Sequence, residues 1–491
     1  MGDRRLVIIG GGLAGMSAGC YALRSGLATT IVEHNLALGG VCTAWHRGPY
    51  TIDGCIHWLT GGPFQRLYEE LEILPEVSLR TLDTWATYRN VRDGVEVPFT
   101  RDLDSLVARL SDISKEDAAE LSRLREGAEV LGSMKPMIEA REVAGVGDLM
   151  RGLWEMRGAV PALVHFRKPA GVWAREHIHS PVLRQLFGRM MPQTAPASFL
   201  LMILGYLQRG FLSRPVGGTA AFRDALERTY RSLGGEVLLH STVDEVLVER
   251  GRAVGVKLAD GTTVSSELVL STSSAPETVL RLLGGRYDAG PTRERLEHWK
   301  LFDPIALASF GVAQPYADAP TLSMIDGIPL YEVGGRTNDS LTVRVCNDDP
   351  CFAPPGHTVV QALLPTDYGW WASRGARYGA EKDMLVDTTI TVLEPHFAGF
   401  RSAVRLTDVA TPLTYWGMAR SWRGAFEGWA PSSESMFGHV KKTLSGLEGF
   451  YMAGQWVEPG GGVPTAVMSG RQAVQLVCKD EGRPFVATSA G

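Results

Sequence analysis

The feature that most restricts the fold is a glycine-rich turn between an apolar stretch and a helix-like stretch near the start of the chain. Residues 5–23 read RLVIIGGGLAGMSAGCYAL, and Gly10, Gly12 and Gly15 have the spacing G-x-G-x-x-G. In this pattern the first glycine allows a tight turn, the second lets a diphosphate approach the backbone, and the third packs a helix on a strand. The segment therefore predicts a Rossmann-type strand, turn and helix that binds a nucleotide.

The residues after the turn favour a dinucleotide. Leu13 and Ala14 begin the expected helix, whose backbone amides and dipole would face the diphosphate. A second strand-like segment, ATTIVEH, ends in Glu33 and His34. An acidic residue about 20 residues beyond the glycine turn binds ribose hydroxyls in such folds. A purely structural glycine turn is the alternative interpretation.

The next segment favours FAD over NAD. It reads NLALGGVCTAWHRGPYTIDG and places Gly39, Gly40 and Val41 just after the acidic residue, with a further glycine turn at 52–54. An NAD-binding unit would continue directly into another helix and strand. Glycine turns that continue this far indicate a longer ligand, with ribityl and ring portions that run on through the protein.

A second glycine cluster lies near the end of the chain, in GFYMAGQWVEPGGGVPTAVMSG. A strand-like stretch ends at Gly454 and Gln455, and three glycines at 460–462 then lead into a helix expected to start near Pro464, a favourable first-turn residue. The amides of this helix start would face the ring edge of a flavin that becomes negative on reduction. We interpret the three glycines as points of close approach, so that one FAD is held from both ends of the chain.

These motifs resemble the phytoene desaturase and carotenoid cis–trans isomerase family, which includes retinol saturases and is more distantly similar to monoamine oxidases. The resemblance covers essentially the whole chain and rests on IIGGGLAGMSAG, the glycine pair before YTIDG, SRPVGGTAAFRDAL and GQWVEPGGGVPTAVMSGR. It implies an α/β fold, with a discontinuous Rossmann-type FAD-binding domain of the amine oxidase and phytoene desaturase superfamily and an inserted α+β substrate domain.

The resemblance also implies that a backbone amide near Val243 contacts adenine. Val41 departs from the family pattern, which often has arginine or serine there, and Gln455 stands where the family often has an acidic residue. The predicted cofactor-binding residues are Gly10, Gly12, Leu13, Ala14, Gly15, Glu33, His34, Gly39, Gly40, Val41, Val243, Gly454, Gln455, Gly462 and Val463.

The length of 491 residues is right for two or three interwoven domains. We expect residues 1–65, 214–285 and 445–491 to form the FAD-binding domain. Residues 66–213 are helix-like and are expected to form a substrate or lid region, and residues 286–444 a strand-rich substrate domain.

Composition excludes several classes of protein. The formal net charge is −5, which argues against a nucleic-acid partner. The six cysteines form no C-x-x-C pair, so we expect free thiols in a reducing cytoplasm. The start of the chain has no apolar signal segment, and the longest apolar run, near 199–207, is too short to span a bilayer. The HIH triplet at 177–179 is a poor metal signal, and no metal site is predicted.

One segment suggests contact with a membrane surface. Residues 151–189 carry seven Lys or Arg against two Glu, with interleaved aromatic residues at 154, 166, 173 and 187. A basic, aromatic surface can lie on an anionic membrane and receive a lipid-like substrate. A lid over a substrate tunnel, with its basic side in water, is the alternative. The adjacent SFLLMILGYL is interpreted as a tunnel wall or core helix.

Few polar residues are candidates for catalysis. His57 follows the turn that runs beside the flavin in this family and could exchange a proton near neutral pH, and Glu458 lies in the ring-facing loop. Both also have structural alternatives, as a satisfied core histidine and as a loop cap. Covalent attachment of FAD to Cys42 or Cys55 is not expected, because the C-terminal motif has no cysteine.

Three functions are compatible with these residues. The leading one is an FAD enzyme that desaturates, isomerises or saturates carbon–carbon double bonds of a long apolar carotenoid, retinoid or polyene. An amine oxidase is the second, since the aromatic pair Tyr415 and Trp416 is available to face the flavin. The third is a non-catalytic lipid-binding escort protein of the same fold. The substrate, electron acceptor and oligomeric state are not predicted.

Overall fold

A mostly parallel sheet is built from the two ends and the middle of the chain. The computed structural model describes residues 4–438 and 440–488. The strands run in the order β10-β2-β1-β14-β21, and β12 and β11 extend the sheet with antiparallel β13 beside β12. The bounds are β1 (Arg5–Ile9), β2 (Ala28–Val32), β10 (Glu236–Leu238), β11 (Val243–Glu249), β12 (Arg252–Leu258), β13 (Thr263–Ser265), β14 (Leu268–Ser271), β20 (Thr443–Leu444) and β21 (Leu447–Met452). Strand β1 pairs in parallel with β2 on one side and with β14 on the other, so the strand order reverses at β1. In such sheets, ligands bind outside the carboxyl ends of the strands at this point.

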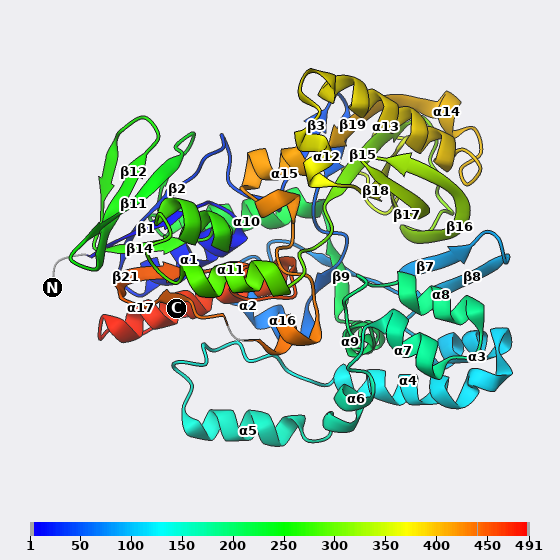
Figure 1. The fold of residues 1–491 in the computed structure, drawn as a ribbon, viewed down its shortest axis with the longest axis horizontal. Coiled ribbons are helices and arrows are strands. Elements are labelled where there is room, and N and C mark those ends of the chain that lie inside the picture. Colours follow the sequence, from blue (N-terminus) through cyan, green and yellow to red (C-terminus); the bar gives the residue numbers. More distant parts are fainter. Residues whose placement is uncertain (1–3, 439, 489–491) are drawn as a thin grey trace.

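Helices from opposite ends of the chain pack together on this sheet, α1 (Leu13–Arg24) and α17 (Gly462–Asp480), with α10 (Gly218–Ser232) beside α1. Figure 1 shows the first two side by side below the strands. Small residues permit the close packing. A Cβ atom on Gly15 would lie 2.1 Å from the Gly10 carbonyl oxygen, and one on Gly470 would lie 2.5 Å from that of Ala14. Gly15 therefore acts as the pattern predicts, at the contact of helix and strand.

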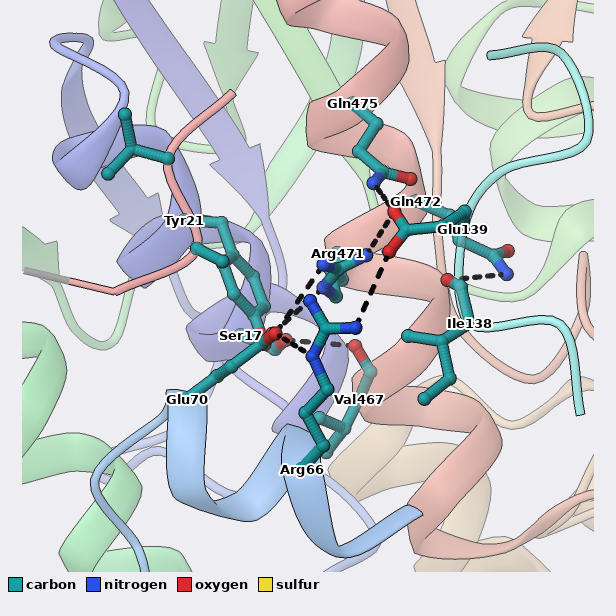
Figure 2. Close-up of polar contacts among 12 residues, drawn as sticks. Ser17, Tyr21, Arg66, Glu70, Ile138, Glu139, Val467, Arg471, Gln472 and Gln475 are labelled. Carbon is teal, nitrogen blue, oxygen red and sulfur yellow. Dashed lines mark hydrogen bonds and ion pairs between the residues drawn. The ribbon is translucent and has the colours of Figure 1, made fainter. Parts of the chain in front are cut away.

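An ion network centred on the buried side chains of Arg471 and Glu70 ties α17 to a helix and a loop from early in the chain (Figure 2). Arg471 donates to Glu70 at 2.8 Å and to Glu139 at 2.6 Å, and only 2% of its side chain is exposed. The Tyr21 hydroxyl and Arg66 also donate to Glu70, at 2.8 and 2.7 Å. Charged groups at this depth need such partners.

A second sheet, mainly antiparallel, lies beside the first, with strand order β19-β15-β18-β17-β16-β7-β8. Its bounds are β7 (Thr84–Asn90), β8 (Val95–Thr100), β15 (Ile305–Val312), β16 (Leu322–Val333), β17 (Arg336–Cys346), β18 (Thr358–Pro365) and β19 (Val404–Ala410). Residues 84–100 had been included in the helix-like region, yet they form a hairpin of this sheet. The helices of this part are α11 (Ala289–His298), α12 (Tyr368–Ala372), α13 (Tyr378–Leu393), α14 (Phe400–Ala403), α15 (Pro412–Ala419) and α16 (Ser433–Phe437).

The helices between residues 103 and 208 form a third part, and all of them except α5 contribute described residues to its apolar core. Their bounds are α3 (Leu103–Ile113), α4 (Ala118–Leu131), α5 (Val146–Met156), α6 (Val160–His165), α7 (Ala170–His177), α8 (Pro181–Arg189) and α9 (Ala197–Gln208). Helix α9 is apolar nearly all round because it is buried at most positions, and α4 packs closely against it. Figure 1 shows α5 at the outer margin, away from both sheets. Among the described helices, none combines the length and the apolarity that crossing a bilayer requires.

Short elements join the three parts: β3 (Ala44–Arg47), β4 (Tyr50–Asp53), β5 (Leu59–Thr60), β6 (Leu79–Thr81), β9 (Leu212–Pro215), α2 (Gln65–Glu70) and the π-helical segment η3 (Glu277–Leu282). Strands β3 and β4 form a hairpin, and β5, β9 and β6 form a small sheet.

The basic segment 151–189 differs from its expected form. Phe166, Trp173 and Phe187 are at most 2% exposed and belong to the helical core, whereas Trp154 is 63% exposed. Arg189 is also occupied, since it pairs with Asp339. The aromatic residues therefore do not alternate with basic ones on a single surface.

Candidate active site

A cavity of about 850 Å³ opens where the three parts meet. Its wall includes Gly12 of the first glycine turn, Glu33 after β2, Gly461 before α17, Tyr206 of α9 and Met324 of β16. The carboxyl ends of the central parallel strands thus open into the same space as the apolar face of α9. All the predicted cofactor-binding residues except Gly15 line this cavity, and so do His57 and Glu458.

The loop after β2 folds back onto the first glycine turn. The Gly39 amide donates to the Gly11 carbonyl at 2.8 Å, and a Cβ atom on Gly40 would lie 3.3 Å from the Gly12 Cα atom. Gly39 and Gly40 adopt φ angles of +131° and +59°, which favour glycine. A Cβ atom on Gly12 would meet no protein atom closer than 3.9 Å. Space therefore remains over the N-terminus of α1, as a diphosphate there requires.

Glu33 is fixed at the end of β2 with 4% exposure. One carboxylate oxygen accepts from the Gly11 amide at 2.7 Å, and the other accepts from the Asn35 amide at 2.8 Å. His34 contacts the Thr242 hydroxyl at 2.7 Å and the Gly417 carbonyl at 3.0 Å, so its ring joins the end of β2 to the segment before β11 and to α15. Both residues stand where the adenosine half of a dinucleotide would lie in such a sheet.

Two features explain why glycine occupies positions 460–462: the backbone conformation of all three residues and the close contact of Gly461 with Glu427. Gly460, Gly461 and Gly462 have φ angles of +114°, +71° and +86°, a region that side-chain-bearing residues rarely adopt. A Cβ atom on Gly461 would also lie 2.9 Å from the Glu427 carboxylate, while one on Gly460 would meet open space. Helix α17 begins directly after this turn, with its N-terminus at the cavity wall.

Gln455 and Gly454 hold the strand end that precedes this turn. The Gln455 side-chain amide donates to the Phe426 carbonyl at 2.6 Å, and the Gly454 amide donates to the Ser469 hydroxyl at 2.7 Å. Val41 and Val463 add apolar contact surface to the same cavity wall. Two helix N-termini and an acidic residue at one cavity wall fit FAD: Gly12 and α1 would face the diphosphate, Glu33 the ribose, and the start of α17 the ring.

The structure limits the acid–base roles that His57 and Glu458, the two candidates from the sequence, can take. Burial and then the nearby Arg344 guanidinium lower the pKa of His57 to about 3, so its ring is neutral at neutral pH. Glu458 forms an ion pair with Lys442, whose side chain is 2% exposed. His57 can still donate or accept a hydrogen bond in the cavity, and Glu458 holds the loop before the glycine cluster.

The sequence analysis missed Glu427, which lines the cavity in close contact with Gly461. Burial raises the pKa of its carboxyl group to about 7. Glu427 lies within the segment GAFEGW, which matches no motif. The sequence marked it only as one acidic residue among aromatic and glycine residues. Tyr415 also lines the cavity, with its ring 5.8 Å from that of Phe426. Its proposed aromatic partner, Trp416, packs instead against Trp422 at 6.1 Å.

His177 of the HIH triplet is exposed on α7 and lies near two other polar side chains. Ligand atoms of His177, His165 and Glu120 lie within 4.8 Å of one another. The Glu120 carboxylate contacts the His165 ring at 2.5 Å and accepts from Trp173 at 3.2 Å. These contacts join α4, α6 and α7 away from the cavity.

The fold and the cavity define a class: oxidoreductases that use FAD in a Rossmann-type domain assembled from both ends of the chain. Residues 13–478 match the family described as flavin containing amine oxidoreductase, and the chain belongs to this family. Membership favours an enzyme over the escort alternative, and it confirms the predicted fold class and FAD as the cofactor.

Two curated relatives and one solved structure are similar to this chain over nearly its whole length. The chain is 23% identical over 508 residues to a phytoene desaturase (lycopene-forming) of Pseudescherichia vulneris, covering 97% of this chain and 99% of that protein. It is 23% identical over 502 residues to prolycopene isomerase 2 of an Oncidium hybrid cultivar, covering 97% and 84%. A putrescine oxidase variant has a similar structure, with a TM-score of 0.66, 14% identity, and 97% and 99% coverage. The predicted resemblance to carotenoid desaturases and isomerases is confirmed.

Proposed function

We propose that this enzyme acts on carbon–carbon double bonds of a long apolar polyene. The observation that carries the proposal is the continuation of the cavity from the glycine turns to an apolar wall. This wall is formed by Phe199, Met202 and Ile203 of α9 together with Leu322 and Met324 of β16. A long apolar molecule would bury its surface there, with one segment beside the cofactor end. The names of the relatives, which include a phytoene desaturase and a prolycopene isomerase, support the same substrate class.

In this proposal the protein groups position the substrate and exclude water. The α9 side chains would hold the substrate extended, and the apolar wall would keep solvent from its reactive carbons. Bound FAD supplies the hydride or electron chemistry. The domain roles follow: residues 1–65, 214–285 and 445–491 hold FAD, and the two inserted segments supply the substrate wall.

Purification followed by assay with polyenes tests the proposal. We expect the protein to retain yellow FAD and to change the visible spectrum of an added carotenoid, either by lengthening the conjugated system or by shifting the cis–trans ratio, as separated by chromatography. Extraction and mass spectrometry of lipid that co-purifies would identify the natural substrate. An FAD-loaded enzyme that leaves desaturase and isomerase substrates unchanged would contradict the proposed function.

An amine substrate is the second candidate, since Glu427 offers the cavity a carboxylate that could bind an ammonium group and the fold resembles that of a putrescine oxidase. Against it, Tyr415 and Trp416 do not form an aromatic pair facing the cavity, because Trp416 packs elsewhere. Release of hydrogen peroxide on addition of amines, without turnover of polyenes, would favour this candidate.

We also propose that α5 and α6 dock on an anionic membrane surface. Met150 and Trp154 are each 63% exposed, and Val160 and Val164 are 48% and 57% exposed. The Arg157 guanidinium lies 3.6 Å from the Trp154 ring centroid, so a cation accompanies the exposed aromatic ring. The segment that leads to α5 contributes Met134 to the cavity wall, which places the proposed docking helices near a route for an apolar substrate.

We expect Trp154→Ser to weaken binding to phosphatidylglycerol-containing vesicles by about tenfold or more, because full burial of a large apolar side chain contributes about 1.5–3 kcal/mol. Sedimentation with vesicles measures the effect. Leu330→Ser is the matched control, since Leu330 is 73% exposed on β16. Equal binding by both variants and the wild type would contradict docking through α5.

A further inference from the structure

Glu427 is held in the cavity by a segment that is anchored through its backbone. The Phe426 carbonyl accepts from Gln455 at 2.6 Å, and the Gly428 carbonyl accepts from the Phe302 amide at 3.0 Å. The indole of Trp429, next along the chain, donates to the Trp456 carbonyl at 3.2 Å. These contacts fix both neighbours of Glu427 and leave its side chain directed at the glycine turn before α17.

The Glu427 carboxylate is available to a ligand. Among residues 4–438 and 440–488 no side-chain hydrogen bond or ion pair involves it. Other carboxylates at the cavity wall are occupied: Glu33 accepts from backbone amides, Glu277 pairs with Arg281 at 2.6 Å, and Glu458 pairs with Lys442. Glu427 therefore differs from these carboxylates in having both oxygens free to act on a bound molecule.

Burial of the Glu427 carboxyl group keeps it close to the midpoint of its titration at neutral pH. Burial raises the pKa of Glu427 to about 7, so the group is neutral below that pH and charged above it. A contact with Cys42 and then burial raise the pKa of the nearby Cys55, and burial raises that of Tyr415, so both stay protonated at neutral pH. A carboxyl group poised in this range suits proton transfer in either direction.

We propose that Glu427 is a catalytic residue that exchanges a proton with a carbon of the substrate beside the glycine turn. The inference rests on the proposed polyene function. In a desaturation, the Glu427 carboxylate takes a proton from one carbon, and the electron pair of that C–H bond becomes the new double bond. The adjacent carbon loses a hydride with its two electrons, for which bound FAD would be the acceptor. In an isomerisation, neutral Glu427 lends its proton to the polyene and recovers it, so no net oxidation occurs.

Glu427→Gln tests the proposal, because the amide keeps the shape of the side chain but cannot exchange a proton at neutral pH. We expect turnover of the polyene to fall at least about 100-fold, while FAD content and thermal unfolding stay within the range of the wild type. In the wild type, the rate of polyene turnover should change with pH near neutrality as Glu427 titrates, and this change should be absent from the variant. A rising limb in the wild type indicates the base of a desaturation, and a falling limb indicates the acid of an isomerisation.

A second readout does not depend on turnover. Infrared difference spectra of the wild type recorded across pH 5–9 should show a carboxyl C=O band that titrates and is missing from Glu427→Gln. Glu434→Gln is the matched control, since Glu434 is exposed on α16. Retention of the polyene rate, or of the titrating band, in Glu427→Gln would overturn the proposal. A wild type that oxidises amines but no polyene would contradict the proposed function, and loss of amine affinity in the variant would then assign Glu427 to cation binding instead.

Discussion

Gly12→Val is expected to give a folded protein that retains no FAD. A Cβ atom at this position meets no protein atom closer than 3.9 Å, so the side chain can be accommodated without displacing the fold. It would instead occupy the space over the N-terminus of α1 and keep the diphosphate from the backbone amides. Loss of two charge-assisted hydrogen bonds, at about 1.5 kcal/mol each, weakens binding by at least about 100-fold.

The flavin absorbance of the purified variant, relative to its protein absorbance, measures this loss. Gly379→Val is the matched control, because Gly379 lies exposed on α13 and an added Cβ atom meets nothing within 4 Å. Circular dichroism of both variants shows whether each is folded. A Gly12→Val protein with near-normal FAD content would contradict the assignment of this turn to the diphosphate.

The parts of the site that could be predicted from sequence depend on local rules. The first glycine turn follows from the steric needs of three positions within six residues, and the structure places Gly12 at the cavity and Gly15 at the contact of helix and strand. The glycines at 460–462 were also identified from sequence, but only as points where a ligand could come close to the backbone. Their positive φ angles could not be inferred, because the same three letters allow several turn conformations.

The hairpin at 84–100 was missed although a local signal was present. Asp93 and Gly94 lie between two segments rich in alternating apolar residues, and Gly94 adopts a φ angle of +65° in the turn. Such a dipeptide between alternating segments is a strong hairpin signal. Residues 84–100 were nevertheless assigned to the helix-like region 66–213, because the residues that follow them have helical periodicity.

Glu427 and the core aromatic residues of the basic segment were beyond local reasoning. Glu427 becomes notable only because α17 brings Gly461 against it from the far end of the sequence and burial shifts its pKa. The membrane-contact interpretation expected Phe166 and Trp173 on the same surface as the flanking charged residues, yet both are buried in the core of the helical part. Long-range packing decides both cases.

The ion network around Arg471 leads to the second large effect that we expect. Its guanidinium joins Glu70 of α2 to Glu139 of the segment that precedes α5 (Figure 2). Although partial burial acts to raise it, hydrogen bonds from Arg471 and Gln475 lower the pKa of Glu139, so the carboxylate is charged at neutral pH. Gln475 also accepts from the Ala140 amide at 2.8 Å. Helix α17 thus has its N-terminus at the cavity wall and also anchors the segment that leads to α5.

Arg471→Met should destabilise the FAD-loaded protein by about 3 kcal/mol, because it leaves Glu70, which is 4% exposed, without its main cation. Arg66 still contacts Glu70, which places the cost at the lower end of the range for a broken buried pair. Thermal unfolding followed by circular dichroism measures the change, and limited trypsin digestion should cut faster at Arg141 once Glu139 is released. Arg252→Met removes an exposed ion pair with Glu448 and should change stability by at most about 1 kcal/mol. If the two variants unfold at the same temperature, or if cleavage at Arg141 is unchanged, then the network does not anchor this segment to α17.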